Sequence, residues 1–311
     1  MMVYNFDGLS SCSFGVKNYF SQINSYLRLT PSRSFKGNFK GLLSTSSREN
    51  VLWTPGQGGS LIHPLQVITC HDVIDFSFYK PSYFRNIKKA IHERLYKNAR
   101  HIVFISDCSL QDFTKTFPSV LTDRSVIRSP TIIESAQSTN ASPIGLDDFI
   151  LVVTNNLEHK NNVDVFGLAA TLQSKQVDFP VVVVGNIVVP KHFEYLLGKS
   201  LFVLNNIPSR ELLGLQTHAT VVISTSLAEG HNLPIAEGLG LGAAVIATAI
   251  PAHEEYYKDL IKFYVAGDIN ELFSKCMEYY PKKLLMRKVL PSGQSWEMVA
   301  SEYSTLFNKI C

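Results

Sequence analysis

The chain has 311 residues, of which 45% are hydrophobic and 18% are charged, and its formal net charge is +3. This composition excludes an intrinsically disordered chain, which would hold fewer apolar residues and more charge. The small net charge and the lack of a nucleic-acid-binding motif disfavour a protein that binds nucleic acid, and the length suits two domains.

The N-terminal half predicts an α/β domain over residues 1–140. Short apolar runs predict strands at 1–6, 50–55, 65–72, 101–106 and 124–130. Apolar residues at helical spacing predict helices at 15–29, 84–99 and 107–116. The first twenty residues lack the basic segment and the apolar core of a secretory signal. The polar, small-residue stretch 134–148 is the best candidate for a linker.

One segment of this half is strongly basic. Residues 80–100 contain seven Lys or Arg residues and one acid, Glu93. A solvated helix face explains such a run as well as a functional surface does. The alternative is a surface for an acceptor or for an anionic membrane, and its candidate residues are Arg85, Lys88 and Lys89.

The C-terminal half, residues 141–295, alternates strand and helix patterns. Continuous apolar runs predict strands at 149–153, 179–186, 200–206, 220–226 and 243–249. Helices are predicted between these strands, at 163–174, 191–198, 209–219 and 233–241. This alternation predicts a parallel sheet covered on both faces, which is a Rossmann-like doubly wound domain. A last helix, 296–311, is expected to pack back on the N-terminal domain.

Two such domains are expected to face each other across a cleft, with ligands at the carboxyl ends of the strands. The stretch SLAEGHNLPIAE, residues 226–237, lies at such an end. Asn232 is a good N-cap residue, and Pro234 fits the first turn of a helix. The backbone N–H groups of that helix start would suit a phosphate.

Two acids, Glu229 and Glu237, flank this helix start. A carboxylate cannot share a phosphate site without repulsion, but it accepts hydrogen bonds from sugar hydroxyls. Glu229 is therefore expected in the turn, pointing into the cleft, and Glu237 within the short helix. The simpler alternative is that both acids only stabilise the helix dipole.

Residues 226–255 resemble the E-x7-E region of the retaining GT-B glycosyltransferases of family 4, also called glycosyltransferase group 1. The family's usual form is close to S-x-x-E-G-F-G-L-P-x-x-E. Glu229 and Glu237 match its two acids, and Gly230, Leu233 and Pro234 also match. His231 and Asn232 stand where Phe and Gly are usual.

Three other segments carry the resemblance. VVTNNLEHKNN is similar to the family's V-G-T-x-x-P-R-K-N segment, which places Lys160 on the donor diphosphate. FGVKNYF resembles the G-V-G-R-Y turn, where Gly15 would approach the donor. VITCHDVID resembles V-x-T-x-H-D, which places His71 at a strand end facing the cleft.

The resemblance implies a retaining, hexosyltransferase-type enzyme whose donor is a nucleoside-diphosphate sugar. Lys160 and the helix start would hold the diphosphate, Glu237 the ribose, and Glu229 and His71 the sugar and the reacting centre. The other donor-binding residues would be Gly15, Gly230, His231, Asn232 and Leu233. No D-x-D sequence occurs, and the five cysteines lack metal-ligand spacing, so neither a metal nor a cofactor is expected.

The expected acceptor is a glycan or a polyprenyl-diphosphate-linked glycan, in the synthesis of a bacterial surface polysaccharide such as lipopolysaccharide O-antigen or capsule. Scattered cysteines suggest reduced thiols, and the longest apolar run, 238–250, is too short for a membrane span. A cytoplasmic protein, peripheral on the inner membrane, is therefore predicted. The alternatives are an inactive or regulatory partner subunit that binds nucleotide sugar, an epimerase or a phosphorylase of the same fold.

Overall fold

The computed structural model describes residues 4–5, 14–31, 50–131, 145–281 and 294–310. The chain divides into two compact units, which comprise residues 1–130 with 294–311, and residues 131–293. We call them unit 1 and unit 2 and describe each by itself. Most of the predicted linker, 134–148, lies outside the described residues.

Among its described residues, unit 1 forms a six-stranded parallel sheet with the order β2-β1-β3-β4-β5-β6. The strands are β1 (Tyr4–Asn5), β2 (Thr30–Pro31), β3 (Leu52–Thr54), β4 (Gln66–Cys70), β5 (His101–Phe104) and β6 (Arg124–Val126). Every side chain of β3 and β4 is buried. Because both faces of the sheet are covered, these central strands carry continuous runs of buried side chains without a polar alternation.

The helices of unit 1 cover both faces of this sheet. They are α1 (Phe14–Leu27), α3 (Ile74–Ser77), α4 (Tyr83–Asn98), α5 (Asp107–Thr116) and α11 (Trp296–Ile310). One core packs α1 and α11 against the sheet, and a second packs α4 and α5 against its other face. Serine hydroxyls cap two of the helices: Ser82 accepts from the Arg85 N–H, and Ser106 accepts from the Ser109 N–H.

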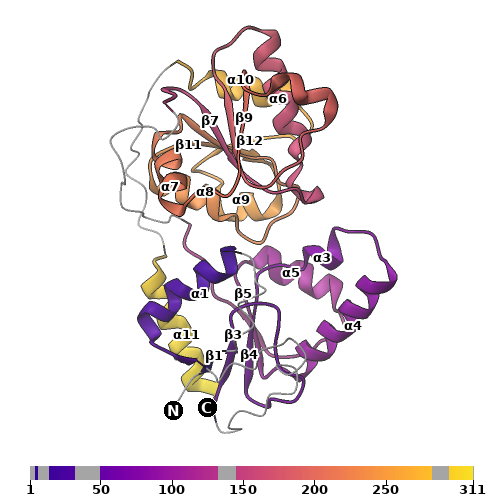
Figure 1. The fold of residues 1–311 in the computed structure, drawn as a ribbon. Coiled ribbons are helices and arrows are strands. Elements are labelled where there is room, and N and C mark those ends of the chain that lie inside the picture. The colour runs from indigo at the N-terminus through magenta and orange to yellow at the C-terminus, as the bar shows by residue number, and fades with distance from the viewer. Residues whose placement is uncertain (1–3, 6–13, 32–49, 132–144, 282–293, 311) are drawn as a thin grey trace. The chain divides into compact units, whose positions relative to one another are not determined.

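The last helix, α11, belongs to unit 1 and lies beside α1 (Figure 1). The buried hydroxyl of Tyr303 lies 3.0 Å from the Tyr19 hydroxyl and 2.7 Å from Oγ1 of Thr69. Trp53 Nε1 donates to the same Oγ1 at 3.0 Å. This network satisfies the buried polar groups and connects the C-terminal helix to β3 and β4.

The described residues of unit 2 form a second six-stranded parallel sheet, with the order β12-β11-β10-β7-β8-β9. The strands are β7 (Ile150–Val153), β8 (Val181–Val184), β9 (Leu201–Leu204), β10 (Val221–Ser224), β11 (Ala244–Thr248) and β12 (Lys262–Tyr264). Counted along the chain, this order is that of a doubly wound sheet, and its direction of growth reverses between β7 and β10.

Helices lie on both faces of the unit 2 sheet (Figure 1). They are α6 (Asn162–Ser174), α7 (Ser209–His218), α8 (Leu233–Gly240), α9 (Pro251–Tyr257) and α10 (Ile269–Met277), with 3-10 turns η2 (Glu158–Lys160) and η3 (Lys191–Leu196). α6 and α10 pack in the core on one face, and α7, α8 and α9 in the core on the other. In the described part of the chain no helix is long and apolar enough to cross a membrane.

Gly185 lies at the end of β8, close to the loop that follows β7. Its φ is +140°, and a Cβ there would lie 1.8 Å from the Thr154 carbonyl oxygen. No side chain fits so close an approach, so glycine is required at this place. Because of this close contact, β7 and β8 stay side by side as far as Thr154, the first residue of the loop that carries Lys160.

The predicted α/β architecture of two parallel-sheet domains is confirmed. Among the described residues, the sequence prediction lacked six elements: β2, α3, η2, α9, β12 and α10. It placed a helix at 191–198, where the structure has the 3-10 turn η3. The predicted helix at 209–219 is α7, which begins at Ser209 with Pro208 at its N-cap.

Candidate functional site

Two loops meet at the carboxyl ends of β7 and β10, where the strand order of the unit 2 sheet reverses. Oγ1 of Thr225 donates to the Lys160 carbonyl at 2.7 Å, and the Leu227 N–H donates to the His159 carbonyl at 2.7 Å. These bonds hold the loop after β10 against the 3-10 turn η2. Ligands of doubly wound sheets bind at such a reversal.

Lys160 and Glu229 form an ion pair between these loops. Nζ lies 2.5 Å from Oε1, and the side chains are only 21% and 11% exposed. Burial acts to raise the pKa of Glu229, but the Lys160 ammonium, a hydrogen bond from Ser226 and nearby His253 together hold that pKa below its ordinary value. Glu229 is therefore a carboxylate at neutral pH, able to accept hydrogen bonds but not to donate a proton.

Asn232 occupies the N-cap of α8, as the sequence predicted. Its backbone is left-handed, with φ +88°, and its side chain makes no capping bond among the described residues. Glycine is the usual residue of the resembled motif here and adopts this conformation freely; asparagine is one of the few others that tolerate it. The substitution therefore preserves the path of the turn.

The carboxamide of Asn232 connects Glu229 to a buried histidine. Its Nδ2 lies 2.7 Å from Ser224 Oγ, 3.0 Å from His253 Nε2 and 3.3 Å from Glu229 Oε1. Nδ1 of His253 donates to the Thr248 carbonyl at 2.9 Å, which leaves Nε2 as an acceptor. Burial lowers the pKa of His253, so the neutral ring that this arrangement needs is the form present at pH 7.

The other residues of the turn are more enclosed than the sequence suggested. Gly230 is buried, and Leu233, the first residue of α8, is half-buried. His231 is 4% exposed, and its ring packs edge-on against Tyr256, with ring centroids 4.4 Å apart. This packing favours a structural role for the His231 side chain within unit 2. From the sequence, it was expected to contact the donor.

Glu237 lies on α8, one turn after its start. Its Oε2 accepts a hydrogen bond from Gln216 Nε2 at 2.8 Å. Burial raises the pKa of Glu237, and the bond from Gln216 opposes part of that rise. The first turn of α8 contains Pro234 and no acid, so its N–H groups present the positive end of the helix dipole.

In unit 1, His71 directly follows β4. Its Nε2 donates to the Pro55 carbonyl at 2.8 Å, and its ring lies edge-on to Tyr19 at 4.8 Å. Burial lowers the pKa of His71 to about 4, so the ring is neutral at pH 7 and its Nδ1 is an acceptor. Gly15 lies in the first turn of α1, half-buried.

Three basic residues of α4, Arg85, Lys88 and Lys89, border its outward face and do not form it. Lys88 pairs with Asp75. The Arg85 guanidinium lies over the Tyr79 ring at 5.2 Å, and the Lys89 ammonium lies 5.5 Å from the ring centre of Phe117. These contacts turn all three side chains toward unit 1. The sequence pattern gave no sign of this, because it records charge without direction.

Four polar residues that support the site were missed: Ser224, Thr225, Gln216 and His253. The first two end a predicted strand at the edge where ligands bind, and His253 lies in the helix that directly follows β11. Their places at the carboxyl end of the sheet could have identified Ser224, Thr225 and His253 from the sequence. Gln216 lies on α7 and offers no comparable signal.

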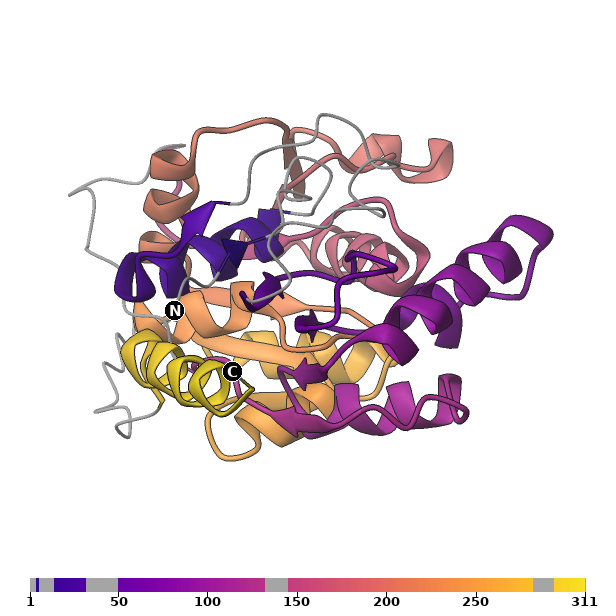
Figure 2. The same ribbon diagram turned by 90° about the horizontal axis from the view of Figure 1, so that it is seen from below.

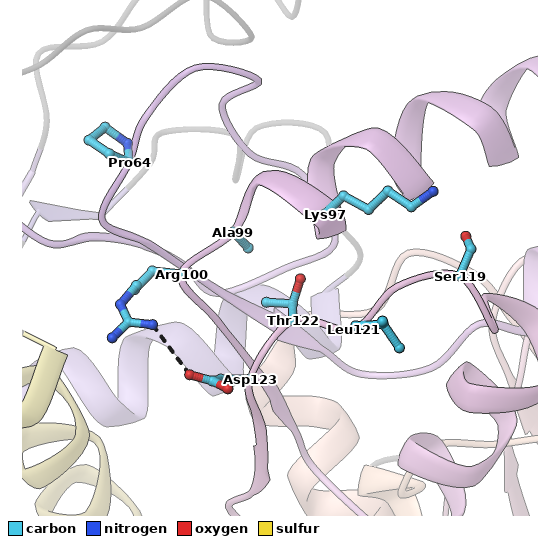
Figure 3. Close-up of a pocket in the computed structure, with 8 residues that line it drawn as sticks. All are labelled: Pro64, Lys97, Ala99, Arg100, Ser119, Leu121, Thr122 and Asp123. Atoms are coloured by element: carbon cyan, nitrogen blue, oxygen red, sulfur yellow. Dashed lines mark hydrogen bonds and ion pairs between the residues drawn. The ribbon is translucent and has the colours of Figure 1, made fainter.

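A hollow of about 470 Å³ in unit 1 lies away from these residues (Figure 3). It is lined by Pro64, Lys97, Ala99, Arg100, Ser119, Leu121, Thr122 and Asp123. Several of these side chains immediately precede β4, β5 or β6, so the hollow lies at the amino ends of the strands, whereas His71 follows a carboxyl end. Within the described ranges, no group of three His, Cys, Asp or Glu residues is arranged to hold a metal ion.

Residues 135–278 match the family model described as "Glycosyl transferases group 1". No curated protein matches the chain. Among solved structures, the chain is similar to a glycosyltransferase from Rickettsia africae, with TM-score 0.67 and 16% identity over 99% of this chain and 98% of that one. It is also similar to sucrose-phosphate synthase from Thermosynechococcus elongatus, with TM-score 0.62 and 15% identity over 84% and 73% of the two chains.

A third similar structure is a trehalose-6-phosphate protein from E. coli bound with UDP-2-fluoro glucose. Its TM-score is 0.56 at 12% identity, over 84% of this chain and 70% of that one. At these identities the likeness establishes the fold. The chain has the α/β fold with two parallel-sheet domains of GT-B glycosyltransferase structures, as the sequence predicted.

Proposed function

We propose that the chain is a glycosyltransferase, which moves a sugar from a nucleoside-diphosphate sugar to a glycan or a lipid-linked glycan. The observation that carries this proposal is the Lys160–Glu229 pair beside the start of α8. It lies at the reversal point of a doubly wound sheet, inside the segment that matches the glycosyltransferase model.

In this proposal the donor diphosphate binds at the start of α8. Its N–H groups and the Lys160 ammonium supply positive charge there without an acid in the first helical turn. Glu237, one turn further along, accepts hydrogen bonds from the ribose hydroxyls. The spacing of eight positions between the two acids keeps Glu237 away from the phosphates and leaves Glu229 in the turn.

Glu229 serves the transferred sugar. Because it is ionised and held by Lys160 and Asn232, it accepts hydrogen bonds from sugar hydroxyls and stabilises positive charge at the reacting carbon. In unit 1, the neutral ring of His71 offers Nδ1 as a second acceptor for the sugar.

Departure of the nucleoside diphosphate develops negative charge at the leaving oxygen. Lys160 and the α8 N–H groups neutralise that charge, and one such donor accounts for about 10²- to 10³-fold in rate. We propose that no divalent cation is needed and that the anomeric configuration is retained by front-face substitution. Glu229 then acts in support and is not a nucleophile.

Uridine diphosphate sugars are the donors to test first, because similar proteins have been solved with UDP or with UDP-2-fluoro glucose. We propose that the product belongs to a bacterial surface polysaccharide and that the enzyme works at an anionic membrane surface. The basic segment 80–100 supports the second part of that proposal.

Two substitutions separate donor binding from turnover. Glu237→Ala is expected to raise the donor KM about 10- to 100-fold, since it removes a charged acceptor worth roughly 1.5–3 kcal/mol. His71→Ala is expected to lower kcat about tenfold, equally at pH 5.5 and pH 8, because its low pKa keeps the wild-type ring neutral throughout that range. The assay is release of nucleoside diphosphate from a panel of nucleotide sugars with extracted glycolipid acceptors. Unchanged kinetics in both variants would remove these assignments.

A further inference from the structure

The outward face of α4 carries four large exposed apolar side chains, although the helix lies in the most basic segment of the chain. Tyr83, Phe84, Ile87 and Ile91 are 75%, 81%, 43% and 42% exposed. Tyr83, Ile87 and Ile91 follow one another at four-residue spacing, and Phe84 lies beside them on the same side of the helix. We call these four residues the α4 stripe.

The opposite side of α4 already has its packing partners. Tyr96 there is buried, and its ring lies 4.9 Å from Phe113 and 5.3 Å from Phe117, whereas Leu95, four residues after Ile91, is buried where the stripe ends. The α4 stripe is therefore a second apolar face, left exposed by the fold of unit 1. Such a face on a soluble protein marks an interaction surface, because large apolar side chains rarely gather in water without a partner.

The charges beside the stripe are positive. Residues 80–100 hold seven Lys or Arg residues and one acid. That acid, Glu93, bonds to Lys97 and to the Ser119 hydroxyl. Lys80 and Arg94 are exposed, and Lys88 keeps 49% of its side-chain exposure despite its pair with Asp75. The partner that fits is therefore both anionic and able to take up apolar side chains.

A second copy of this chain does not meet that description, because it would bring the same cations against one another. A bilayer with anionic headgroups meets it. A helix that lies in the headgroup region buries aromatic and aliphatic side chains about 5–10 Å deep while Lys and Arg contact phosphates. The α4 stripe extends about 12 Å along the helix, from residue 83 to residue 91, at 1.5 Å per residue.

We propose that α4 docks unit 1 on an anionic membrane, with the α4 stripe inserted among the headgroups and the neighbouring cations on lipid phosphates. The proposal rests on the membrane partner of the proposed function and specifies the residues that meet it. From the sequence, Arg85, Lys88 and Lys89 were expected to form the membrane surface. In this proposal apolar side chains make the main contact, and these three cations lie beside it. Figure 2 shows α4 at the edge of unit 1.

The test is sedimentation of the full chain with phosphatidylglycerol–phosphatidylcholine vesicles and with pure phosphatidylcholine vesicles. The wild type is expected to sediment with the anionic vesicles and at least tenfold less with the neutral ones. The double variant Tyr83→Ser/Phe84→Ser is expected to lose at least tenfold in partitioning on anionic vesicles. Leu121→Ser is the matched control, because Leu121 is 85% exposed elsewhere in unit 1, and it is expected to bind like the wild type.

Failure of the wild type to sediment with anionic vesicles would overturn the proposal, as would unchanged binding of the double variant. A dimer in size-exclusion chromatography that the double variant abolishes, without vesicle binding, would assign the stripe to a second copy instead. Circular dichroism checks that each variant is folded. Nucleotide-sugar binding is measured on the same samples, so loss of membrane binding with intact donor binding rejects this proposal alone.

Discussion

Replacing Lys160 with methionine is expected to lower the rate of sugar transfer about 10²- to 10³-fold, because the leaving diphosphate loses its only predicted side-chain cation. The same change is expected to destabilise the protein by about 3 kcal/mol, since breaking a buried ion pair leaves an unpaired charge. That value is at the low end of the usual range because the Lys160 side chain keeps 21% exposure. Urea unfolding and donor kinetics measure the two effects.

The stability loss in Lys160→Met has a predictable dependence on pH. In the wild type the pKa of Glu229 is below its ordinary value, so its contribution is present above about pH 4.5 and is lost as the pH falls below it. Without Lys160, burial raises the pKa of Glu229, and protonation relieves the unpaired charge as the pH falls. The difference between the two proteins is therefore expected to be large at pH 7 and to shrink toward pH 4.5.

The control is Lys275→Met, which breaks the i,i+4 pair with Glu271 on α10. Surface pairs of this kind contribute less than about 1 kcal/mol, so only a small loss is expected. Equal losses in the two variants, or a Lys160→Met deficit that does not change with pH, would contradict our account of Glu229.

Asn232→Ala is expected to be the second strongly affected variant. Alanine at φ +88° adds backbone strain of about 1–2 kcal/mol. Loss of the bonds to Ser224 and His253 adds about 1 kcal/mol each, so the free energy of unfolding should fall by roughly 3 kcal/mol. Transfer activity is expected to fall with it, because the turn that holds Glu229 loses its connection to His253.

Two further variants separate the backbone strain from the lost hydrogen bonds in the Asn232→Ala stability loss. Asn232→Gly keeps the left-handed turn and loses only the hydrogen bonds, so its deficit should be smaller than that of Asn232→Ala by the strain alone. Asn206 is exposed, lies outside the candidate site and has a φ of +53°. Asn206→Ala therefore measures the cost of left-handed backbone strain alone. If Asn232→Gly and Asn232→Ala unfold at the same urea concentration, backbone conformation is not what Asn232 contributes.

Several elements of the fold were predictable because their residues are buried on both faces. β7 and β8 are continuous runs of Val, Ile and Leu, and such short runs rich in β-branched residues favour a covered parallel strand. The missed elements are short or lie near the sheet edges. β12, Lys262–Tyr264, is an edge strand of three residues with one buried side chain, and so short a pattern predicts little.

The candidate site was predictable in position but not in its internal contacts. Motif spacing placed Glu229 in a turn and Glu237 on a helix, and both lie there. The ion pair of Glu229 with Lys160 joins residues 69 positions apart, and the bond from Asn232 to His253 spans 21. Such contacts depend on the register of β7 against β10, which no single segment encodes. The direction of the α4 side chains depends likewise on what packs beneath that helix.

In the proposed function, unit 2 binds a nucleoside-diphosphate sugar at the start of α8. Thermal unfolding of the full chain against a panel of nucleotide sugars tests it most directly. At a ligand concentration of 100 times Kd, binding adds about 2.7 kcal/mol, so at least one member of the panel is expected to raise Tm by several degrees. Lys160→Met is expected to reduce that rise. A wild-type Tm that no nucleotide sugar changes, in a sample folded by circular dichroism, would contradict the claim.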